Sequence, residues 1–268
     1  MTDWSLCQDD VMTQQQDSRT VEFLEPVRLS FVEAQFPCVS SEELAAVDGL
    51  WEEAGTANPS LFDGPAVACV GVERQGPGLV LAWARASYRY QLLRHIRGAG
   101  AWLPSSVYVA VLQPVDELGL VVGRSSPSTA AAGRWTLPGG LVEPPAEGEP
   151  LDLAGLRRHA ARELAEEIGV HVGNQDLELW AVTRGEHGNV GVHFRAPRLP
   201  EPLVRKQFEA VTLAERARGV EPELEQLTTV RTREEVTALR SWADYLPQVV
   251  NRFASAPPSG LRGAGPMW

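Results

Sequence analysis

The chain has 268 residues, of which 44% are hydrophobic, and this predicts one large globular domain or two small ones. The net charge of −11 argues against a nucleic-acid groove or an anionic membrane as main partner, because both need basic patches. The three cysteines are widely spaced, which favours reduced thiols over a disulfide framework. The sequence shows neither a signal pattern nor a membrane-spanning apolar run, so it predicts a cytoplasmic protein.

The amino-terminal part of the chain predicts a polar, flexible segment followed by a small α/β unit. The flexible segment covers residues 1–20. Turn residues and apolar periodicity then predict a capped helix from Ser40 or Ser41 to just before Asn58-Pro59, a hairpin of strands 67–72 and 79–84, and a helix over 88–97. No linker separates this part from the rest of the chain, so we expect residues 21–100 to pack as an extension on a core at 101–253.

The remainder of the chain predicts alternating strands and helices, followed by a tail rich in Pro, Gly and Ser at 254–268. The elements are a pair of strands at 107–113 and 119–123, a small-residue loop at 125–133, an amphipathic helix from the cap Asp152 to Gly169, strands 178–184 and 190–195, a helix at 204–210, a strand at 227–230, and closing helices at 233–241 and 244–253.

The helix that begins after Asp152 concentrates acids on one face. Residues three and four apart on a helix are neighbours, so Glu163, Glu166 and Glu167 form a cluster whose mutual repulsion a cation would relieve. Mg²⁺ prefers oxygen ligands and usually keeps waters and substrate phosphates in its shell. The cluster therefore predicts an open site that handles a diphosphate.

The stretch Arg162-Glu163-Leu164-Ala165-Glu166-Glu167-Ile168-Gly169-Val170 resembles the second half of the Nudix box at every fixed position. The upstream Leu137-Pro138-Gly139-Gly140-Leu141-Val142-Glu143 also looks like the loop of that family. Arg162 follows Gly140 by 22 positions instead of the family's 14, so about eight residues are inserted. The glutamate of the first half would fall on Ala154, and its role is vacant or is taken by Glu143, Glu147 or Glu149.

The Nudix resemblance implies an α+β fold, an α/β/α sandwich with a mixed sheet, to which the amino-terminal α/β extension is added. It also implies a Mg²⁺-dependent hydrolase, with Mn²⁺ as an alternative metal. Catalytic roles are implied for Glu163, Glu166 and Arg162, with Arg162 orienting a carboxylate. Metal ligands are implied at Gly140, Glu163, Glu166, Glu167 and a distant acid, Glu223 or Glu225, of which Glu225 is the first choice.

A looser resemblance concerns the substrate. Trp51-Glu52-Glu53, the segment 58–64 and Ser87-Tyr88-Arg89-Tyr90 look like the amino-terminal region of the animal Nudix enzymes that hydrolyse UDP-glucose. This favours a UDP-sugar, cleaved to UMP and a sugar 1-phosphate. Candidate substrate-binding residues are Tyr88, Arg89 and the loop residue His187.

Three alternatives remain beside the UDP-sugar hydrolase. The first is a hydrolase of ADP-ribose, NADH or dinucleotides. The second is a catalytically silent Nudix domain that binds a nucleotide and reports it to a partner, which the altered first half of the box motivates. A nucleic-acid role such as decapping is the third, and the negative charge disfavours it. The expected partner is a nucleotide-linked small molecule, and the chain is compatible with a homodimer.

Overall fold

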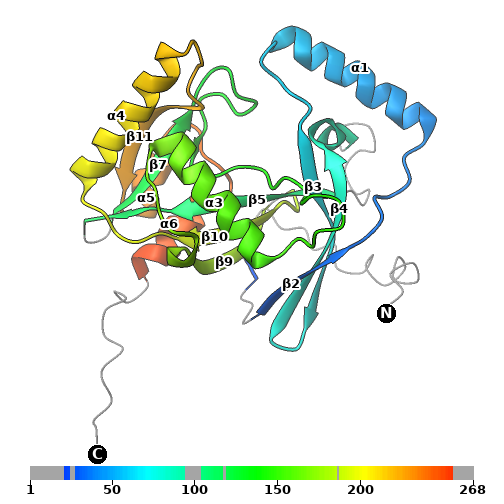
Figure 1. Cartoon of the computed structure of the whole chain (residues 1–268), viewed down its shortest axis with the longest axis horizontal. Helices are drawn as coiled ribbons and strands as arrows, with labels where there is room; N and C mark the ends of the chain where they lie inside the picture. The colour runs from blue at the N-terminus through cyan, green and yellow to red at the C-terminus, as the bar shows by residue number, and fades with distance from the viewer. Residues whose placement is uncertain (1–20, 25–27, 94–103, 117–118, 186, 256–268) are drawn as a thin grey trace, which may run out of the picture.

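The computed structural model describes residues 21–24, 28–93, 104–116, 119–185 and 187–255. These residues form an α+β fold with one mixed sheet, a second antiparallel sheet and helices packed against both (Figure 1). The predicted fold class, α+β with a mixed sheet, is confirmed. Residues 1–20 and most of the predicted tail at 254–268 lie outside the described residues.

The described elements, in chain order, fall into strands and helices. The strands are β1 Glu22–Phe23, β2 Arg28–Glu33, β3 Pro65–Gln75, β4 Gly78–Ser87, β5 Ser105–Leu112, β6 Pro114–Val115, β7 Gly119–Ser125, β8 Trp135–Thr136, β9 Glu178–Arg184, β10 Val190–Arg195 and β11 Leu224–Val230. The helices are α1 Ser41–Ala57, η3 Tyr88–Leu92, α3 Leu153–Ile168, η4 Asn174–Asp176, α4 Glu201–Ala217, α5 Arg233–Thr237 and α6 Leu246–Ser255.

The larger sheet joins the amino-terminal part of the chain to the part that carries the acid cluster. Its seven strands have the order β1-β9-β10-β5-β3-β4-β2. β5 pairs in parallel with β10 on one side and antiparallel with β3 on the other, where Ala68 lies opposite Ser106 and Cys69 opposite Ser105. The strands β2, β3 and β4 therefore extend the same sheet that supports the acid-bearing helix.

The predicted pairing of strands 107–113 and 119–123 is correct only beside the turn, where Pro114–Val115 (β6) pairs with the start of β7 and the backbone N–H of Val121 donates to the Gln113 carbonyl at 3.1 Å. β5 stays in the larger sheet, whereas β7 lies in the second sheet between β11 and β6, with β8 beside it. Pro114 has no backbone N–H to continue the β5 ladder, and the chain changes sheet there, with Asp116 turning at a φ of +46°. The parallel partner of β5 is 78 or more residues away in sequence, so the local pattern could not show it.

The remaining predicted elements agree with the structure in type and differ in length. The hairpin is present as β3 and β4, the strands at 178–184 and 190–195 are present with the predicted bounds, and α1 begins after Ser40 with a capping box. α4 and β11 are longer than predicted, and α5 is shorter. The predicted helix 88–97 begins as a 3₁₀ helix, and residues 94–97 lie outside the described part. Strands β1 and β2 were not predicted.

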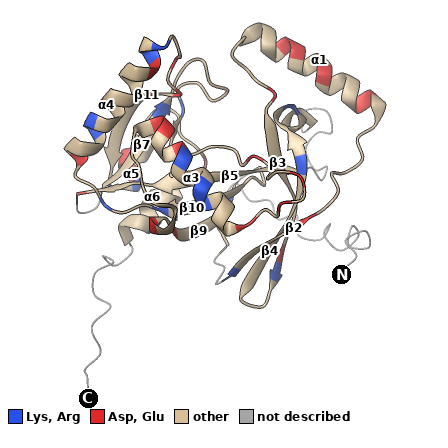
Figure 2. Ribbon diagram, viewed as in Figure 1, with Lys and Arg blue, Asp and Glu red and all other residues tan. Residues whose placement is uncertain are grey.

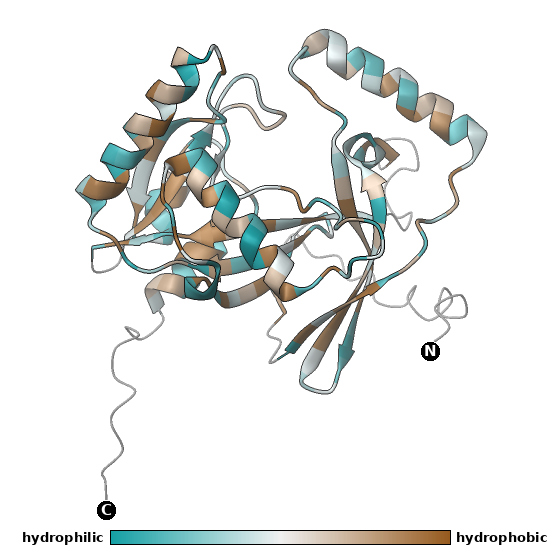
Figure 3. Cartoon of the chain, in the orientation of Figure 1, coloured by the Kyte–Doolittle hydropathy of each residue, from teal (hydrophilic) through white to brown (hydrophobic). Residues whose placement is uncertain are grey.

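A continuous hydrophobic core lies between the larger sheet and α3. Leu156, Ala160 and Leu164 are fully buried on the inner face of α3, and they belong to one cluster with Leu81 and Val109 of the sheet. Figure 3 shows hydrophobic residues along the strands and hydrophilic residues on the outer face of α3. Within the described residues, every helix is too short or too polar to cross a bilayer.

Candidate active site

Helix α3 presents the acid cluster because its two ends are fixed. At its start, the side chain of Asp152 accepts a hydrogen bond of 2.6 Å from the backbone N–H of Gly155, as the sequence predicts for an N-cap. At its end, Gly169 has a φ of +71°, and an added Cβ would lie 2.7 Å from the carbonyl oxygen of Gln207 in α4. The apolar face of α3 is buried, and Figure 2 shows acidic and basic residues along the rest of the helix.

The segment with Gly139 and Gly140, which precedes α3, lies directly beside β5. The backbone N–H of Val111 donates to Pro138 and that of Val109 to Gly140, at 2.7 and 2.9 Å. Gly139 has a φ of +150°, and a Cβ there would lie 2.1 Å from the carbonyl oxygen of Val109. This position therefore requires glycine, for the close approach that the sequence pattern indicates.

Two acids of α3 reach this glycine turn. The carboxylate of Glu167 accepts a hydrogen bond of 2.7 Å from the backbone N–H of Gly139. The carboxylate of Glu163 lies so close to Gly140 that an added Cβ would be 2.6 Å from Oε2. The structure thus brings Glu163 and Glu167, from consecutive turns of α3, to one short backbone segment.

Glu163 is held by two neighbours on its own helix, His159 and Arg162. Its Oε1 lies 3.1 Å from Nε2 of His159 and 3.4 Å from Nη2 of Arg162, and only 14% of its side chain is exposed. Burial by itself raises the pKa of Glu163, but the interactions with His159 and then with Arg162 outweigh it and lower that pKa. Glu163 is therefore an ionised carboxylate with a fixed orientation.

Glu167 and Glu223 have the opposite electrostatic character. Burial raises the pKa of Glu167 well above its ordinary value, the Gly139 N–H opposes this, and the charges of Glu223, Glu163 and Glu166 raise it further. The pKa of Glu223 is raised by burial and then by the charges of Glu163 and Glu166, although Glu223 keeps access to solvent. Arg162 lies near Glu163 and Glu166, whereas no cation is among the groups that shift the pKa of Glu167 or Glu223.

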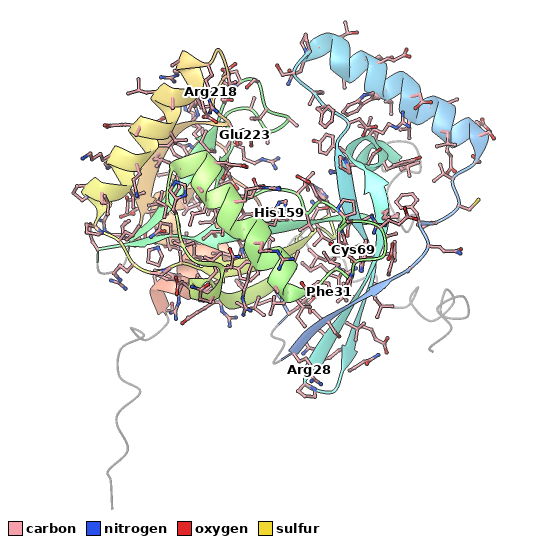
Figure 4. The ribbon with its side chains drawn as sticks, viewed as in Figure 1. Arg28, Phe31, Cys69, His159, Arg218 and Glu223 are labelled. Carbon is pink, nitrogen blue, oxygen red and sulfur yellow. The ribbon has the colours of Figure 1, made fainter. Side chains whose placement is uncertain are left out.

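The other predicted ligands occupy different surroundings. The side chain of Glu166 is 62% exposed, with Oε2 at 3.8 Å from Nε of Arg162. Glu225 forms an ion pair of 3.2 Å with Arg124 on the neighbouring strand β7, whereas Glu223 lies by the carboxyl-terminal half of α3 (Figure 4). The Gly140 carbonyl already accepts the hydrogen bond from Val109, which leaves one lone pair for a further ligand.

The eight-residue insertion forms a loop between the glycine turn and α3. Just before this loop, Oε1 of Glu143 lies 2.9 Å from Nη2 of Arg162. Among the three glutamates considered for the missing position, Glu143 is thus the one in an ion pair with the box arginine. A cavity of about 320 Å³ lies between this loop and α3, and its lining includes Glu143, Glu149, Arg158, His159 and Arg162.

The predicted substrate-binding residues contact different groups. Tyr88 packs its ring edge against Trp51, and burial raises its pKa while the charge of Arg134 in the β7–β8 loop opposes the rise. Arg89 forms ion pairs with Asp48 and Asp63, at 2.9 and 3.2 Å, inside the amino-terminal part.

His187 lies exposed on the turn between β9 and β10. This turn is attached to the start of β5, where the Ser105 hydroxyl donates a hydrogen bond of 2.7 Å to the Gly188 carbonyl. Tyr88 and Arg89 thus have partners in the amino-terminal part, His187 lies on a turn attached to β5, and the substrate-binding roles of all three stay predictions.

The donor set fits a hard divalent cation. Carboxylates dominate it, and oxygen ligands of this kind are those that Mg²⁺ and Mn²⁺ take. Among the described residues, no three carboxylate, histidine or cysteine side chains form a ready-made ligand cluster. Glu163 and Glu167 would be the inner ligands, and the charges of Glu163 and Glu166 act on both Glu167 and Glu223.

His159 is the site residue that sequence reasoning missed. Its side chain is 9% exposed, its Nε2 faces Glu163, and its Nδ1 lies 3.2 Å from Nη2 of Arg162 (Figure 4). The available signal was its position, one helical turn before Glu163 on the same face of α3. A lone histidine within an arginine-rich helix is otherwise unremarkable.

No protein-family model matches the sequence, and no curated protein matches it either. Among solved structures, the chain is similar to a MutT protein from Methanosarcina mazei, with 18% identity, 56% of this chain and 92% of that chain covered, and a TM-score of 0.36.

The NUDIX domain of NrtR from Shewanella oneidensis, solved with ADP ribose, shows 16% identity, coverage of 57% and 88%, and a TM-score of 0.36. A MutT NUDIX hydrolase from Burkholderia pseudomallei shows 20% identity, coverage of 47% and 83%, and a TM-score of 0.30. Similarities of this size assign neither a family nor an activity, so the functional proposal rests on the residues of the site.

Proposed function

We propose that the protein is a Nudix-type hydrolase that uses a divalent metal to cleave the diphosphate of a nucleotide linked to another moiety. The observation that carries the proposal is the convergence of Glu163 and Glu167 on the Gly139-Gly140 backbone, with the charge of Glu223 beside them. A diphosphate resists hydrolysis mainly because its oxygens repel the nucleophile. A site with surplus negative charge can hold the cations that offset this repulsion.

Each residue then has a distinct role. Glu163 and Glu167 hold the metal, and Arg162 together with His159 fixes the direction of the Glu163 carboxylate. The metal, when bound, acts as a Lewis acid on the phosphate oxygens and lowers the pKa of a bound water. Glu166 is more exposed and shares ligation or accepts a proton from the attacking water.

We assign the distant acid to Glu223 in preference to Glu225. Glu225 is held by Arg124, whereas the charges of Glu163 and Glu166 act directly on Glu223. Glu223 also begins the turn into β11, where its carbonyl accepts a hydrogen bond of 2.8 Å from the backbone N–H of Ser126. This hydrogen bond fixes the backbone position of Glu223.

The first substrate to test is a UDP-sugar, on the amino-terminal resemblance, and the second is ADP-ribose. We propose that the alternative of a silent nucleotide sensor is the weaker one. The missing box glutamate motivates that alternative, yet Glu143 supplies a carboxylate to Arg162 from just before the inserted loop. The fold thus offers a replacement partner for the box arginine despite the altered spacing.

The Glu163→Gln variant tests the assignment at the central residue. It keeps the shape of the side chain but removes the charge that a metal requires, so we expect turnover to fall about 100-fold or more. The melting temperature should stay near that of the wild type. The matched control is Glu209→Gln on the exposed surface of α4, which should keep full activity. Full activity of Glu163→Gln would refute the hydrolase assignment.

A substrate panel with Mg²⁺ or Mn²⁺ in ¹⁸O-labelled water separates the remaining alternatives. The panel contains UDP-glucose, other nucleotide sugars, ADP-ribose, NADH and dinucleotides. The products identify the substrate class, and the position of the label identifies the phosphorus that is attacked. Stabilisation by a nucleotide without any turnover, at every metal concentration, would support the sensor instead.

A further inference from the structure

Arg85, close to the end of β4, connects the amino-terminal strands to the inserted loop. Its Nη1 donates a hydrogen bond of 2.7 Å to the carbonyl of Pro145, and its Nη2 donates one of 3.2 Å to the carbonyl of Ala146. Its Nε forms an ion pair of 3.0 Å with Glu33 on the adjacent strand β2. One guanidinium thus uses all three nitrogens, two on consecutive loop carbonyls and one on a carboxylate that holds it in place.

The loop that Arg85 contacts has no helix or strand of its own between Glu143 and Asp152. Its first residue, Glu143, reaches Arg162, and its last, Asp152, caps α3. The hydrogen bonds from Arg85 are made between these two ends. A loop without regular structure has many accessible conformations, so a bidentate contact at its middle strongly restricts them.

The inserted loop also forms one wall of the cavity of about 320 Å³ beside α3. His159 and Arg162 line this cavity and at the same time contact Glu163 of the proposed metal site. The remaining polar lining, which includes Glu149 and Arg158, offers both hydrogen-bond acceptors and donors. Such a mixed lining suits the hydroxyl groups of a sugar.

We propose that Arg85 is a positioning residue of the site. It holds the inserted loop against α3, so that Glu143 stays on Arg162 and the cavity receives the hydroxyl-bearing moiety attached to the diphosphate. The statement that the cavity receives this moiety rests on the proposed hydrolase function. It assigns the amino-terminal strands a part in substrate recognition, because β4 supplies the residue that shapes the cavity.

Three variants test this role, with a fourth as control. Arg85→Ala removes both loop contacts, Arg85→Lys keeps the charge but offers no planar fork, and Glu33→Gln weakens only the support of Arg85. The control is Arg74→Ala, an exposed arginine at the far end of the same hairpin. Hydrogen exchange of peptides covering residues 143–152 is measured for each variant, as are kcat and KM for UDP-glucose and ADP-ribose.

We expect Arg85→Ala to increase exchange in residues 143–152 at least about tenfold and to raise KM about tenfold, with kcat changed less than about threefold. Arg85→Lys should recover part of both effects, and Glu33→Gln should show smaller ones. Arg74→Ala should match the wild type. Unchanged exchange in Arg85→Ala would overturn the inference, and so would an unchanged KM.

The exchange measurement also separates this inference from the proposed function. If the wild type hydrolyses no member of the panel, the hydrolase proposal fails. The exchange of residues 143–152 in Arg85→Ala still decides whether Arg85 holds the loop, because that measurement requires no substrate. A fall in kcat equal to the loss in kcat/KM, with KM unchanged, would show that Arg85 acts on catalysis and not on the cavity.

Discussion

Gly140 shows how closely the Glu163 carboxylate is fitted to the backbone before α3. A methyl group at this position would lie 2.6 Å from Oε2 of Glu163, well inside contact distance. The carboxylate can move away from such a group, since it is the end of a flexible side chain. Gly140→Ala should therefore displace a proposed metal ligand while leaving the fold almost unchanged.

We expect Gly140→Ala to lower kcat/KM about 100-fold, because a shift of about 1 Å in a catalytic group has effects of this size. The melting temperature should change by only a few degrees. Gly55→Ala in α1 is the control, since nothing lies within 4 Å of the added Cβ. Wild-type kinetics of Gly140→Ala would show that Glu163 is not held at this point for catalysis.

His193 makes a second prediction at the residue scale, concerning stability. It is fully buried on β10, its Nε2 lies 2.7 Å from the Thr183 hydroxyl, and the rings of Tyr108 and Tyr245 pack against it. Burial lowers its pKa from 6.5 to about 3. Between these values the unfolded chain binds a proton that the folded chain does not, so stability falls as the pH decreases.

The contribution of His193 is fully present above pH 6.5 and is lost as the pH falls towards 3. From pH 7 to pH 5 this corresponds to about 2 kcal/mol in the free energy of unfolding. Urea unfolding at both pH values measures this decrease. The decrease in the free energy of unfolding should be about 2 kcal/mol smaller in His193→Gln than in the wild type. An identical pH dependence in both proteins would contradict the assignment.

The sequence predicted the site residues whose pattern is local and missed those whose role depends on packing. Glu163, Arg162 and the glycine pair could be found because their spacing on one helix and one turn is visible in the chain. His159 and Arg85 could not be found in that way. Arg85 donates to the backbone carbonyls of residues that are 60 and 61 positions away in sequence. No side-chain pattern reveals such contacts.

At the scale of elements, the glycine turn is the segment most constrained by its neighbours. Gly139 faces β5, where an added Cβ would lie 2.1 Å from the carbonyl oxygen of Val109 and 2.8 Å from Cα of Ala110. Both are backbone atoms of a buried strand, which cannot move aside as a side chain can. The φ of +150° adds strain for any residue with a Cβ.

Gly139→Ala should therefore lower the free energy of unfolding by about 2–4 kcal/mol, from steric overlap and backbone strain together. Chemical denaturation checks this value, and Gly140→Ala, one residue further on, provides the comparison. The two variants should differ in kind, with Gly139→Ala affecting mainly stability and Gly140→Ala mainly activity. A stable Gly139→Ala protein would mean that the turn is not pressed onto β5.

The elements themselves were predictable where amphipathic periodicity, caps and turns coincide, as in α1, α3, β9 and β10. Their pairing was not. Strand β5 carries buried residues along most of its length, so its sequence does not indicate which strand lies on either side. The change of sheet at Pro114 and the parallel contact with β10 are set by the packing of distant segments.

At the scale of the whole molecule, the amino-terminal strands complete the sheet under the proposed active site. β3 pairs with β5, and the backbone N–H of Val67 donates a hydrogen bond of 2.8 Å to Val142, just after the glycine turn. Leu81 and Trp83 of β4 are almost fully buried in the same core cluster as Leu156 of α3. Loss of these strands would expose that core and one edge of β5.

We therefore expect a fragment of residues 101–268 to lack a cooperative unfolding transition and to have no measurable hydrolase activity. Burial of one large apolar side chain contributes about 1.5–3 kcal/mol, so losing the partners of several such residues exceeds the total stability of a typical domain. Deletion of residues 1–20 alone should preserve both properties. Thermal unfolding followed by circular dichroism, with activity on the same samples, checks both fragments. A 101–268 fragment that unfolds cooperatively and retains activity would show that this part of the chain folds independently of β2, β3 and β4.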